Sequence, residues 1–537
     1  MADYEFGTLN WTILIAYLIA NIVMGMFVGQ KVKTADDFFL GQKTIPWWAI
    51  GVSVIATYVS ALSFLGGPAW TYEKGLSVLA IHLNYPVVIF FVVALFLPFF
   101  YNSGVASIYE YLERRFGSKS RSIISLIFLI SQALTSAAVL YATSLVIEFI
   151  TGLDVMYAIV IVTVVALIYT MMGGIAAVIW TDVVQAGILL IGAVIICYEL
   201  IGHLELPLGE TLAQLKAAGK TDALNFSWDF SNDATVWSGV IAMTLFHLTV
   251  YGANQMMVQR TLTAKNIGDA KKSFLLMGYG AFFIYFLFFV TGILFYSYYD
   301  GQPFDNGNTI ILEFAANLAI PGLMGIIAAA VVAASMSSLD SAFNSMTTVS
   351  VIDFYQRYFK PDESAEHYLK VSRIFTIGWA ILIILPAILY AESSGSILET
   401  LSKIGSFFVG AKLSMFGLGF FSKHTTERGL LTGVVVGFVV IWWVATSTDI
   451  AWPWYCAIGG GVNIVVSIAA SLLLDGRQEH YSPYSIKGQQ KYFDDNNLPT
   501  KDGGWWLVPG RFDRSTYWLL VFFVATLVGL YLFNALI

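Results

Sequence analysis

The 537-residue chain is 58% hydrophobic and 12% charged, whereas an average soluble domain is about 45–50% apolar and 25% charged. This composition excludes an ordinary water-exposed surface and predicts a protein embedded in the lipid bilayer. The formal net charge of −7 says little by itself, and no nucleic-acid partner is expected.

Fourteen segments are long and apolar enough to cross a bilayer, since a helical span needs about 20 mostly apolar residues. Lipid offers the backbone no hydrogen-bond partners, so strands or loops in these segments would leave polar groups unpaired. The predicted fold class is therefore an all-α polytopic membrane protein. The predicted spans are residues 8–29, 46–72, 76–101, 122–150, 155–174, 177–202, 235–258, 274–299, 321–352, 373–392, 397–421, 429–446, 452–474 and 515–537.

The basic residues predict the orientation in the membrane, because lysine and arginine concentrate in inner connections. With the N-terminus placed outside, 23 of the 28 basic residues fall in inner connections, three fall in outer ones and two lie within a span. Both termini are therefore predicted to face outside. The five exceptions are Lys74, Lys216, Lys220, Lys403 and Lys412.

The first span and the long connections give no sign of a signal peptide or a separate domain. The span follows MADYEFGTLN, which has no basic n-region, and no small-residue cleavage site comes after it, so it is predicted to be a retained helix. Cys197 and Cys456 lie within spans, where a thiol usually fills apolar space. Neither of the connections 203–234 and 475–514 is predicted to be a domain, and 475–514 is predicted to be a surface linker.

Two spans carry small polar residues, glycine and proline where a passive anchor would carry leucine. This pattern predicts helices that unwind in mid-membrane, because irregular backbone survives there only beside a cavity. The alternative is that small residues merely allow close helix packing. The residues are Ser53, Thr57, Ser60, Ser63, Gly66, Gly67 and Pro68 in span 46–72, and His247, Thr249, Gly252, Asn254 and Gln255 in span 235–258.

A serine-rich segment of span 321–352 is a candidate sodium site. On a helix, Ala334, Ser337, Ser338 and Ser341 share one face at three- and four-residue spacing. Sodium is a hard cation that binds oxygen ligands, which serine hydroxyls and the carbonyls of a bent helix supply. The alternative is a serine-rich packing face.

Two carboxylates and two histidines also lie within predicted spans. A carboxylate at membrane depth costs about 2.5–3.5 kcal/mol on insertion scales, so Asp182 and Asp340 are expected to face a cavity, an ion or a partner. Asp182 could instead be hydrated near the inner interface. His82 and His247 together indicate a polar cavity, although either one could be an ordinary core histidine.

The remaining charged residues within spans and the absence of enzyme motifs limit the functions that the sequence allows. Glu399 and Lys403 are four residues apart and could pair with each other, whereas Lys412 has no partner near it in the sequence. The sequence contains no GxSxG, HExxH, Walker A or CxxC motif. The chain is therefore predicted not to be an enzyme and to need no cofactor.

Four segments resemble the sodium/solute symporters, a family that includes carriers of sugars, sialic acid, iodide, vitamins and monocarboxylates. The resemblance covers residues 8 to about 475, and the second and third segments are specific to it. The segments are TADDFFLGQKTIPWWAIGVSVIATYVSALSFLG from Thr34, YTMMGGIAAVIWTDVVQ from Tyr169, YGANQMMVQRTLTAKN from Tyr251, and the serine-rich stretch within 328–345.

The resemblance implies a core of ten helices in two inverted five-helix repeats that work by alternating access. One extra helix precedes this core and three follow it. The expected divisions are residues 1–45 (extra helix and inner loop), 46–202 (first repeat), 203–234 (outer loop), 235–421 (second repeat) and 422–537 (three extra helices with the inner linker 475–514).

The resemblance also implies where coupling ions bind. The family's sodium site lies between the first and eighth core helices. A second site, which some relatives hold nearer the inside, has a hydroxyl residue where this chain has Asp340, and a carboxylate there should strengthen cation binding or favour a proton. The matching positions are Ala56, Val59, Ala334, Ser337 and Ser338 for the first site, and Asp182, Ser337, Asp340 and Ser341 for the second.

The family's solute positions carry over less well. The galactose-type carriers place glutamate, asparagine and glutamine where His82, His247 and Ser402 stand, and the sialic acid carriers place a carboxylate-clamping arginine where Thr135 stands. Hydroxyls with two histidines would suit a differently held sugar or polyol, or a small anion if the histidines donate. The matching positions are Thr57, Tyr58, Ser60, Ser63, His82, Tyr85, His247, Tyr251 and Ser402.

These patterns predict a sodium-coupled symporter that imports a small polar organic solute, namely a sugar, a polyol or a small carboxylate. The alternatives are a proton-coupled symporter, motivated by Asp340 and the two histidines, and a ligand sensor with the same fold. The expected partners are sodium, the solute and the lipid bilayer, and the expected location is a bacterial inner membrane. The sequence specifies neither the solute nor the oligomeric state.

Overall fold

The computed structural model describes residues 6–103, 105–304, 307–391 and 397–537, and the side chains of residues 42, 103 and 391–404 lie outside the described part. Within these ranges the protein is almost entirely helical, which confirms the predicted all-α membrane fold. The elements are α1 (Gly7–Gly29), α2 (Ala35–Leu40), η1 (Gly41–Lys43), α3 (Trp47–Tyr58), α4 (Ala61–Lys74), η2 (Leu76–His82), α5 (Tyr85–Phe91), η3 (Val92–Phe96), α6 (Leu97–Ser103), α7 (Glu110–Arg115), α8 (Ser118–Thr151), α9 (Val155–Gly202), α10 (Leu208–Ala217), η4 (Ser238–Ala242), α11 (Met243–Gly252), α12 (Gln255–Leu262), α13 (Ile267–Tyr298), η5 (Gly307–Thr309), α14 (Ile310–Leu318), α15 (Leu323–Val349), η6 (Ser350–Phe359), α16 (Ala365–Ala391), α17 (Ile397–Phe421), α18 (Glu427–Ser447), α19 (Trp454–Leu474), α20 (Ile486–Asp495), β1 (Lys501–Asp502), β2 (Trp505–Trp506), η7 (Arg514–Thr516) and α21 (Tyr517–Leu536).

Ten helices in the described ranges are long and apolar enough to cross a membrane, and the bent pair α3 and α4 makes eleven. The chain is therefore a multi-pass membrane protein. A count of fourteen further requires that α9 form two spans and that the shorter apolar helices Ser238–Gly252 and Gly405–Phe421 each form one. The number fourteen stays a prediction.

The helix α9 is broken at Gly174, which has φ 54° and ψ −150°. Its 48 residues would form a straight rod of about 72 Å, whereas the hydrocarbon core is about 30 Å thick. Tyr169 Oη and Gln185 Nε2 lie 3.5 Å apart although they are 16 residues apart in sequence, so the two arms fold back on each other. The break falls between the predicted spans 155–174 and 177–202.

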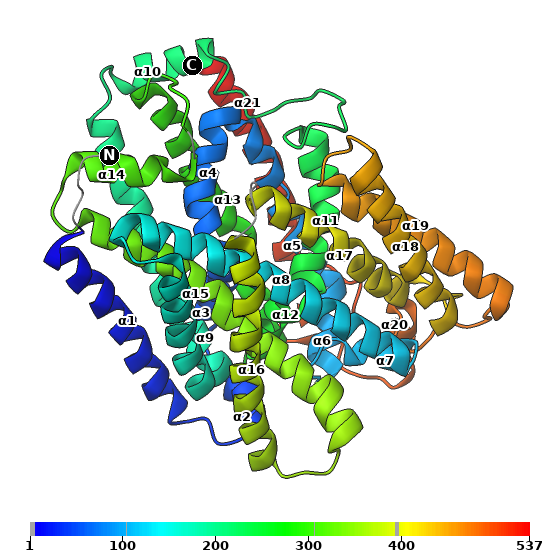
Figure 1. Cartoon of the computed structure of the whole chain (residues 1–537). Helices are drawn as coiled ribbons and strands as arrows, with labels where there is room; N and C mark the ends of the chain where they lie inside the picture. Colours follow the sequence, from blue (N-terminus) through cyan, green and yellow to red (C-terminus); the bar gives the residue numbers. More distant parts are fainter. Residues whose placement is uncertain (1–5, 104, 305–306, 392–396) are drawn as a thin grey trace.

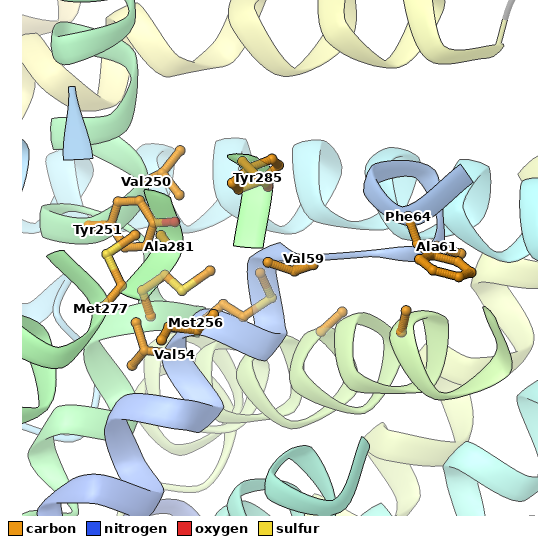
Figure 2. Close-up of a cluster of buried hydrophobic side chains, with 14 of the residues drawn as sticks. Val54, Val59, Ala61, Phe64, Val250, Tyr251, Met256, Met277, Ala281 and Tyr285 are labelled. Atoms are coloured by element: carbon orange, nitrogen blue, oxygen red, sulfur yellow. The ribbon is translucent and has the colours of Figure 1, made fainter. Parts of the chain in front are cut away.

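The predicted span 46–72 is interrupted, as its composition indicated, but the break lies at Val59 and Ser60. Both residues have extended backbone, and the axes of α3 and α4 meet at 58°. Figure 2 shows Val59 at this break, between Val54 of α3 and Phe64 of α4. The last carbonyls of α3 therefore lose their helical partners in the protein interior.

The glycines and proline that drew attention to this span lie inside α4 instead. A Cβ atom added to Gly67 would lie 3.0 Å from the ring of Phe289 on α13, and Thr71 Oγ1 donates to the Phe289 carbonyl oxygen at 3.0 Å. The small residue at position 67 therefore serves close packing of α4 against α13, which was the alternative interpretation.

The predicted span 235–258 also ends in a break. The π-helix η4 continues into α11, which stops before Ala253, and α12 begins after Asn254, whose side chain accepts a hydrogen bond from the Met256 backbone N–H. The polar residues at 254 and 255 therefore belong to a helix start rather than to a continuous span.

The helices α3, α9 and α15 lie in the middle of the molecule, with α1 along one side and α18 and α19 along the opposite side (Figure 1). The connection 203–234 contains the short helix α10. The connection 475–514 contains α20 and the antiparallel pair β1 and β2. These short elements are the regular structure that the two connections contain among the described residues.

Three basic residues that were assigned to inner connections are buried in the protein. A carboxylate partner compensates the charge of each one. The pairs are Arg121 with Asp353 at 2.6 Å, Arg260 with Asp182 at 3.3 Å, and Lys271 with Asp513 at 2.6 Å.

Candidate functional site

A cavity of about 290 Å³ lies beside the break between α3 and α4. Side chains from α3, α4, η2, α8, α11, α13, α15 and α17 line it, so the cavity joins segments that are far apart in sequence. Six of the nine predicted solute-site residues line it. These are Thr57, Tyr58, Ser60, Ser63, His82 and His247.

The serine face of α15 meets the end of α3 at this cavity. Ser338 Oγ donates to the Thr57 carbonyl oxygen at 3.1 Å and lies 3.5 Å from the Ala334 carbonyl oxygen. The carbonyl end of a helix carries partial negative charge, and the break leaves such carbonyls beside the serine hydroxyls. The structure thus brings α3 and α15 together where the predicted sodium ligands Ala56, Val59, Ala334, Ser337 and Ser338 are found.

A buried polar cluster adjoins this contact and is built around Asp182, Arg260 and Asp340. Asp182 Oδ1 accepts from Ser337 Oγ at 2.6 Å, and Asp182 Oδ2 accepts from Ser53 Oγ at 2.5 Å. Arg260 Nη2 lies 3.3 Å from Asp182 Oδ2, and Arg260 Nε donates to Ser53 Oγ at 2.8 Å. The guanidinium and the carboxylate are therefore held by the same hydroxyl.

Asp340 lies in the same cluster but bonds to neutral groups. Its Oδ2 accepts from Tyr169 Oη at 2.7 Å, and its Oδ1 lies 3.1 Å from Ser341 Oγ. Arg260 Nη2 also donates to Ser341 Oγ. All four members of the predicted second sodium site, Asp182, Ser337, Asp340 and Ser341, are thus joined by hydrogen bonds to one another or to Arg260.

Two carboxylates and one guanidinium give this cluster a formal charge of −1. Asp182 and Asp340 are each 0% exposed and Arg260 is 1% exposed, and an uncompensated charge in the protein interior is costly. The interpretation of Asp182 as a hydrated carboxylate near the interface is therefore wrong. The cluster can accept one monovalent cation or one proton.

The hydrogen bonds of His247 fix its tautomer. Asn84 Nδ2 donates to two backbone carbonyls, of Ile81 at 2.7 Å and Gly239 at 2.9 Å, so Asn84 Oδ1 must accept from His247 Nδ1 at 2.7 Å. In the neutral imidazole, Nε2 then accepts from Tyr58 Oη at 3.2 Å. His247 has no proton left to donate to a solute.

His82 packs against aromatic rings at the edge of the cavity. Its ring stacks on Tyr285 with centroids 3.7 Å apart, and its Nδ1 bonds to Tyr85 Oη at 2.8 Å. Tyr85 and Tyr251 are buried behind the residues that line the cavity. The side chain of Ser402 lies outside the described residues.

A second hollow of about 1090 Å³ adjoins the cavity. The two share Gly66, Trp70 and Trp452. The second hollow is lined by residues of the predicted outer connections, including Asp233 and Asp449. The cavity thus adjoins a hollow on the side that was predicted to face outside.

Several residues of the site did not appear among the predicted ones. Arg260 was counted as a loop residue, although it lies within the quoted segment from Tyr251. Tyr285 is one of many aromatic residues in an apolar span. Lys412 was noted only for lacking a local partner, yet it lines the cavity with Ser131 of α8. No group of three or more His, Cys, Asp or Glu side chains that could hold a metal ion occurs among the described residues.

The sequence model of the sodium:solute symporter family matches residues 38–437. The chain is 31% identical over 496 residues to the sodium/sialic acid symporter SiaT of Proteus mirabilis, a match that covers 89% of this chain and 98% of that protein. It is 31% identical over 471 residues to the sodium/glucose cotransporter of Vibrio parahaemolyticus, with 81% and 85% covered. Among solved structures, a sodium-coupled sialic acid symporter in a substrate-bound outward-open state superposes with a TM-score of 0.82 and 29% identity, over 89% of this chain and all of that one.

Proposed function

Because the chain belongs to the sodium:solute symporter family, whose members are sodium-coupled transporters rather than enzymes, we propose that it imports a sugar, a polyol or a small carboxylate with sodium by alternating access. The observation that carries this proposal is the contact between the broken α3–α4 segment and the serine face of α15. That contact gathers oxygen ligands in the protein interior, directly beside the cavity and the buried polar cluster.

In this proposal the first sodium ion binds at the break. The carbonyls of Ala56, Val59 and Ala334 and the hydroxyls of Ser337 and Ser338 supply its ligands. Such neutral oxygens suit a hard monovalent cation. Ser338 now donates to the Thr57 carbonyl oxygen, and ion binding would turn its oxygen toward the sodium.

The charge of the neighbouring cluster supports a second ion. Asp182, Ser337, Asp340 and Ser341 provide carboxylate and hydroxyl oxygens around a formal charge of −1, and a sodium ion there would neutralise it. Because Arg260 already contacts Asp182 and Ser341, the second sodium would lie on the Asp340 side of the cluster.

The transport cycle follows from differential affinity for the two states. Sodium bound at the break joins α3 to α15 in the outward-facing state and organises the cavity for the solute. Solute binding then permits closure, and loss of sodium on the inside, where it is scarce, releases the solute. We place this cycle in a bacterial inner membrane with both termini outside, on the basis of the loop charges and the bacterial relatives.

The experiment that tests the sodium site compares Ser338→Ala with Ser345→Ala. Both serines lie on α15, but Ser345 Oγ donates only to carbonyls of its own helix, at 2.7 and 3.2 Å. We expect Ser338→Ala to abolish the sodium dependence of solute uptake in proteoliposomes and Ser345→Ala to retain it. Uptake by Ser338→Ala with unaltered sodium dependence would show that the site is misplaced.

Proton coupling is a second candidate, favoured by one observation. Asp340 bonds to Tyr169 and Ser341 and has no ion pair with any residue in the described ranges. A proton on Asp340 would neutralise the cluster as well as a sodium ion would. An inward proton gradient would then replace the sodium gradient as the driving force.

A further inference from the structure

Lys412 of α17 is a buried basic residue without a carboxylate partner in the described part of the chain. It is 4% exposed, it lines the cavity, and its Nζ donates to Ser131 Oγ at 2.8 Å. The Nζ also lies 5.5 Å from the centroid of the Phe128 ring. These two neutral neighbours do not compensate a full positive charge.

The other deeply buried basic residues show what such a charge normally requires. A buried ion pair needs close geometry and further hydrogen bonds, because removing both charges from water is costly. Each of these residues meets that need with an aspartate. They are Arg121, Arg260 and Lys271, whose partners lie at 2.6, 3.3 and 2.6 Å.

The environment of Lys412 leaves donors available toward the cavity. An ammonium group has three N–H donors, and the structure shows one hydrogen bond from it. Ser131 Oγ donates its own proton to the Phe128 carbonyl oxygen at 3.1 Å, so it is held as an acceptor for Lys412. Gln132, Thr135 and Ser136, further along α8, line the same cavity.

We propose that Lys412 is the anion-binding residue of the solute cavity and that the transported solute carries a carboxylate. This inference rests on the proposed function and narrows its substrate class from sugar, polyol or carboxylate to an organic acid. His247 has no proton to donate, because Nδ1–H binds Asn84 and Nε2 accepts from Tyr58. Among the described residues that line the cavity, Lys412 is the one lysine or arginine. The charge of the acid is met there, at α17, while its neutral part faces the break and the histidines.

The test uses the full-length protein in proteoliposomes with an inward sodium gradient and three matched pairs of probes. Each pair joins an acid to an uncharged analogue: lactate and lactamide, gluconate and sorbitol, nicotinate and nicotinamide. Uptake and sodium-dependent thermal stabilisation are measured for the wild type, Lys412→Gln and Lys412→Arg. Lys216→Gln, which removes an exposed lysine of α10, is the control for loss of charge alone.

We expect the wild type to prefer the acid in at least one pair, with about tenfold tighter apparent affinity. Lys412→Gln should weaken binding of that acid about 10- to 100-fold, as for a lost hydrogen bond to a charged group, and should change binding of the uncharged analogue by a much smaller factor. Lys412→Arg and Lys216→Gln should keep the preference for the acid.

Equal or better binding of the uncharged analogues, no binding of any acid, or an acid affinity unchanged in Lys412→Gln would each overturn the inference. The proposed function is tested separately by the same data. Sodium-driven uptake of an uncharged probe would leave sodium symport standing while removing the role of Lys412. Uptake of an acid that does not depend on the sodium gradient would contradict sodium symport and leave the role of Lys412 standing.

Discussion

Arg260 and Lys412 are both basic, both buried and both close to the broken α3–α4 segment, yet their surroundings are opposite. Arg260 contacts Asp182, Ser53 and Ser341, all from the protein itself. Lys412 contacts one serine hydroxyl and an aromatic ring beside an open cavity. One cation is compensated by the fold and the other is not.

The difference extends to the balance of charge on each side. The cluster around Arg260 contains two carboxylates and has a formal charge of −1, which one monovalent cation or one proton would neutralise. With Lys412 protonated, the cavity has one formal positive charge more than the described residues neutralise. A sodium ion in the cluster and an acid in the cavity would balance both regions together, which gives a physical reason for coupling their binding.

The largest expected effect is on stability, in which variants of Arg260 and Lys412 should differ most. Arg260→Met leaves two buried carboxylates without a guanidinium and should destabilise the folded protein by about 3–5 kcal/mol. Lys412→Met, which removes a charge without a carboxylate partner, should leave the stability unchanged or raise it. Unfolding in detergent, followed by tryptophan fluorescence, measures the stability of both variants. Equal losses of stability would mean that the surroundings of Arg260 and Lys412 do not differ as described.

The double variant Arg260→Met/Asp182→Asn tests whether the instability of Arg260→Met comes from the unpaired charge of Asp182. Removing Asp182 with its partner should recover part of the lost stability, because no charge of that pair is left alone. A double variant as unstable as the sum of the single ones would indicate that Arg260 acts through other contacts.

The next effect concerns the second cation that we propose for the cluster around Asp182, Arg260 and Asp340. Asp340→Asn makes the cluster formally neutral, so the half-saturating sodium concentration for uptake should rise about tenfold, which corresponds to about 1.4 kcal/mol. Asp362→Asn, at an exposed position, is the matched control and should behave as wild type. If Asp340→Asn left sodium activation unchanged and instead removed a pH dependence of uptake, Asp340 would carry a proton.

The smallest effect concerns the cavity side that faces the histidines. Tyr58→Phe removes the hydroxyl that donates to His247 Nε2 at 3.2 Å, and a buried acceptor left unpaired costs about 1–3 kcal/mol. The half-saturating solute concentration should rise about fivefold, which corresponds to the lower end of this range, with little change in the sodium requirement. Tyr531→Phe on the exposed face of α21 provides the control, and a sodium requirement that moved with the Tyr58 change would place this tyrosine at the ion site.

The sequence predicted the membrane fold well, because span length and apolar composition are local properties. An interruption of span 46–72 and the serine face of α15 were also visible in composition and spacing, but the position of the break at Val59 and Ser60 was not. The surroundings of Arg260 were not, since its contacts come from residues 78 and 207 positions away, as counted to Asp182 and Ser53. Its place in a segment specific to the family was a signal, but the residues next to it in sequence do not show which carboxylate it meets.

The same limit applies to Lys412, whose hydrogen-bond partner Ser131 is 281 residues distant. Helical spacing predicts which residues share a face, but it does not predict which helix that face meets. The contact between Lys412 of α17 and Ser131 of α8 could therefore not be predicted from the sequence, because it depends on how the two helices pack.

The most direct test of the account is uptake by purified protein in proteoliposomes, with an inward sodium gradient compared with an inward proton gradient at equal membrane potential. The account predicts that one of the organic acids accumulates above its external concentration when sodium is the driving ion, and that the proton gradient alone gives no accumulation. Accumulation driven by protons without sodium would contradict the sodium sites, and ligand binding without any accumulation would identify a sensor instead of a symporter.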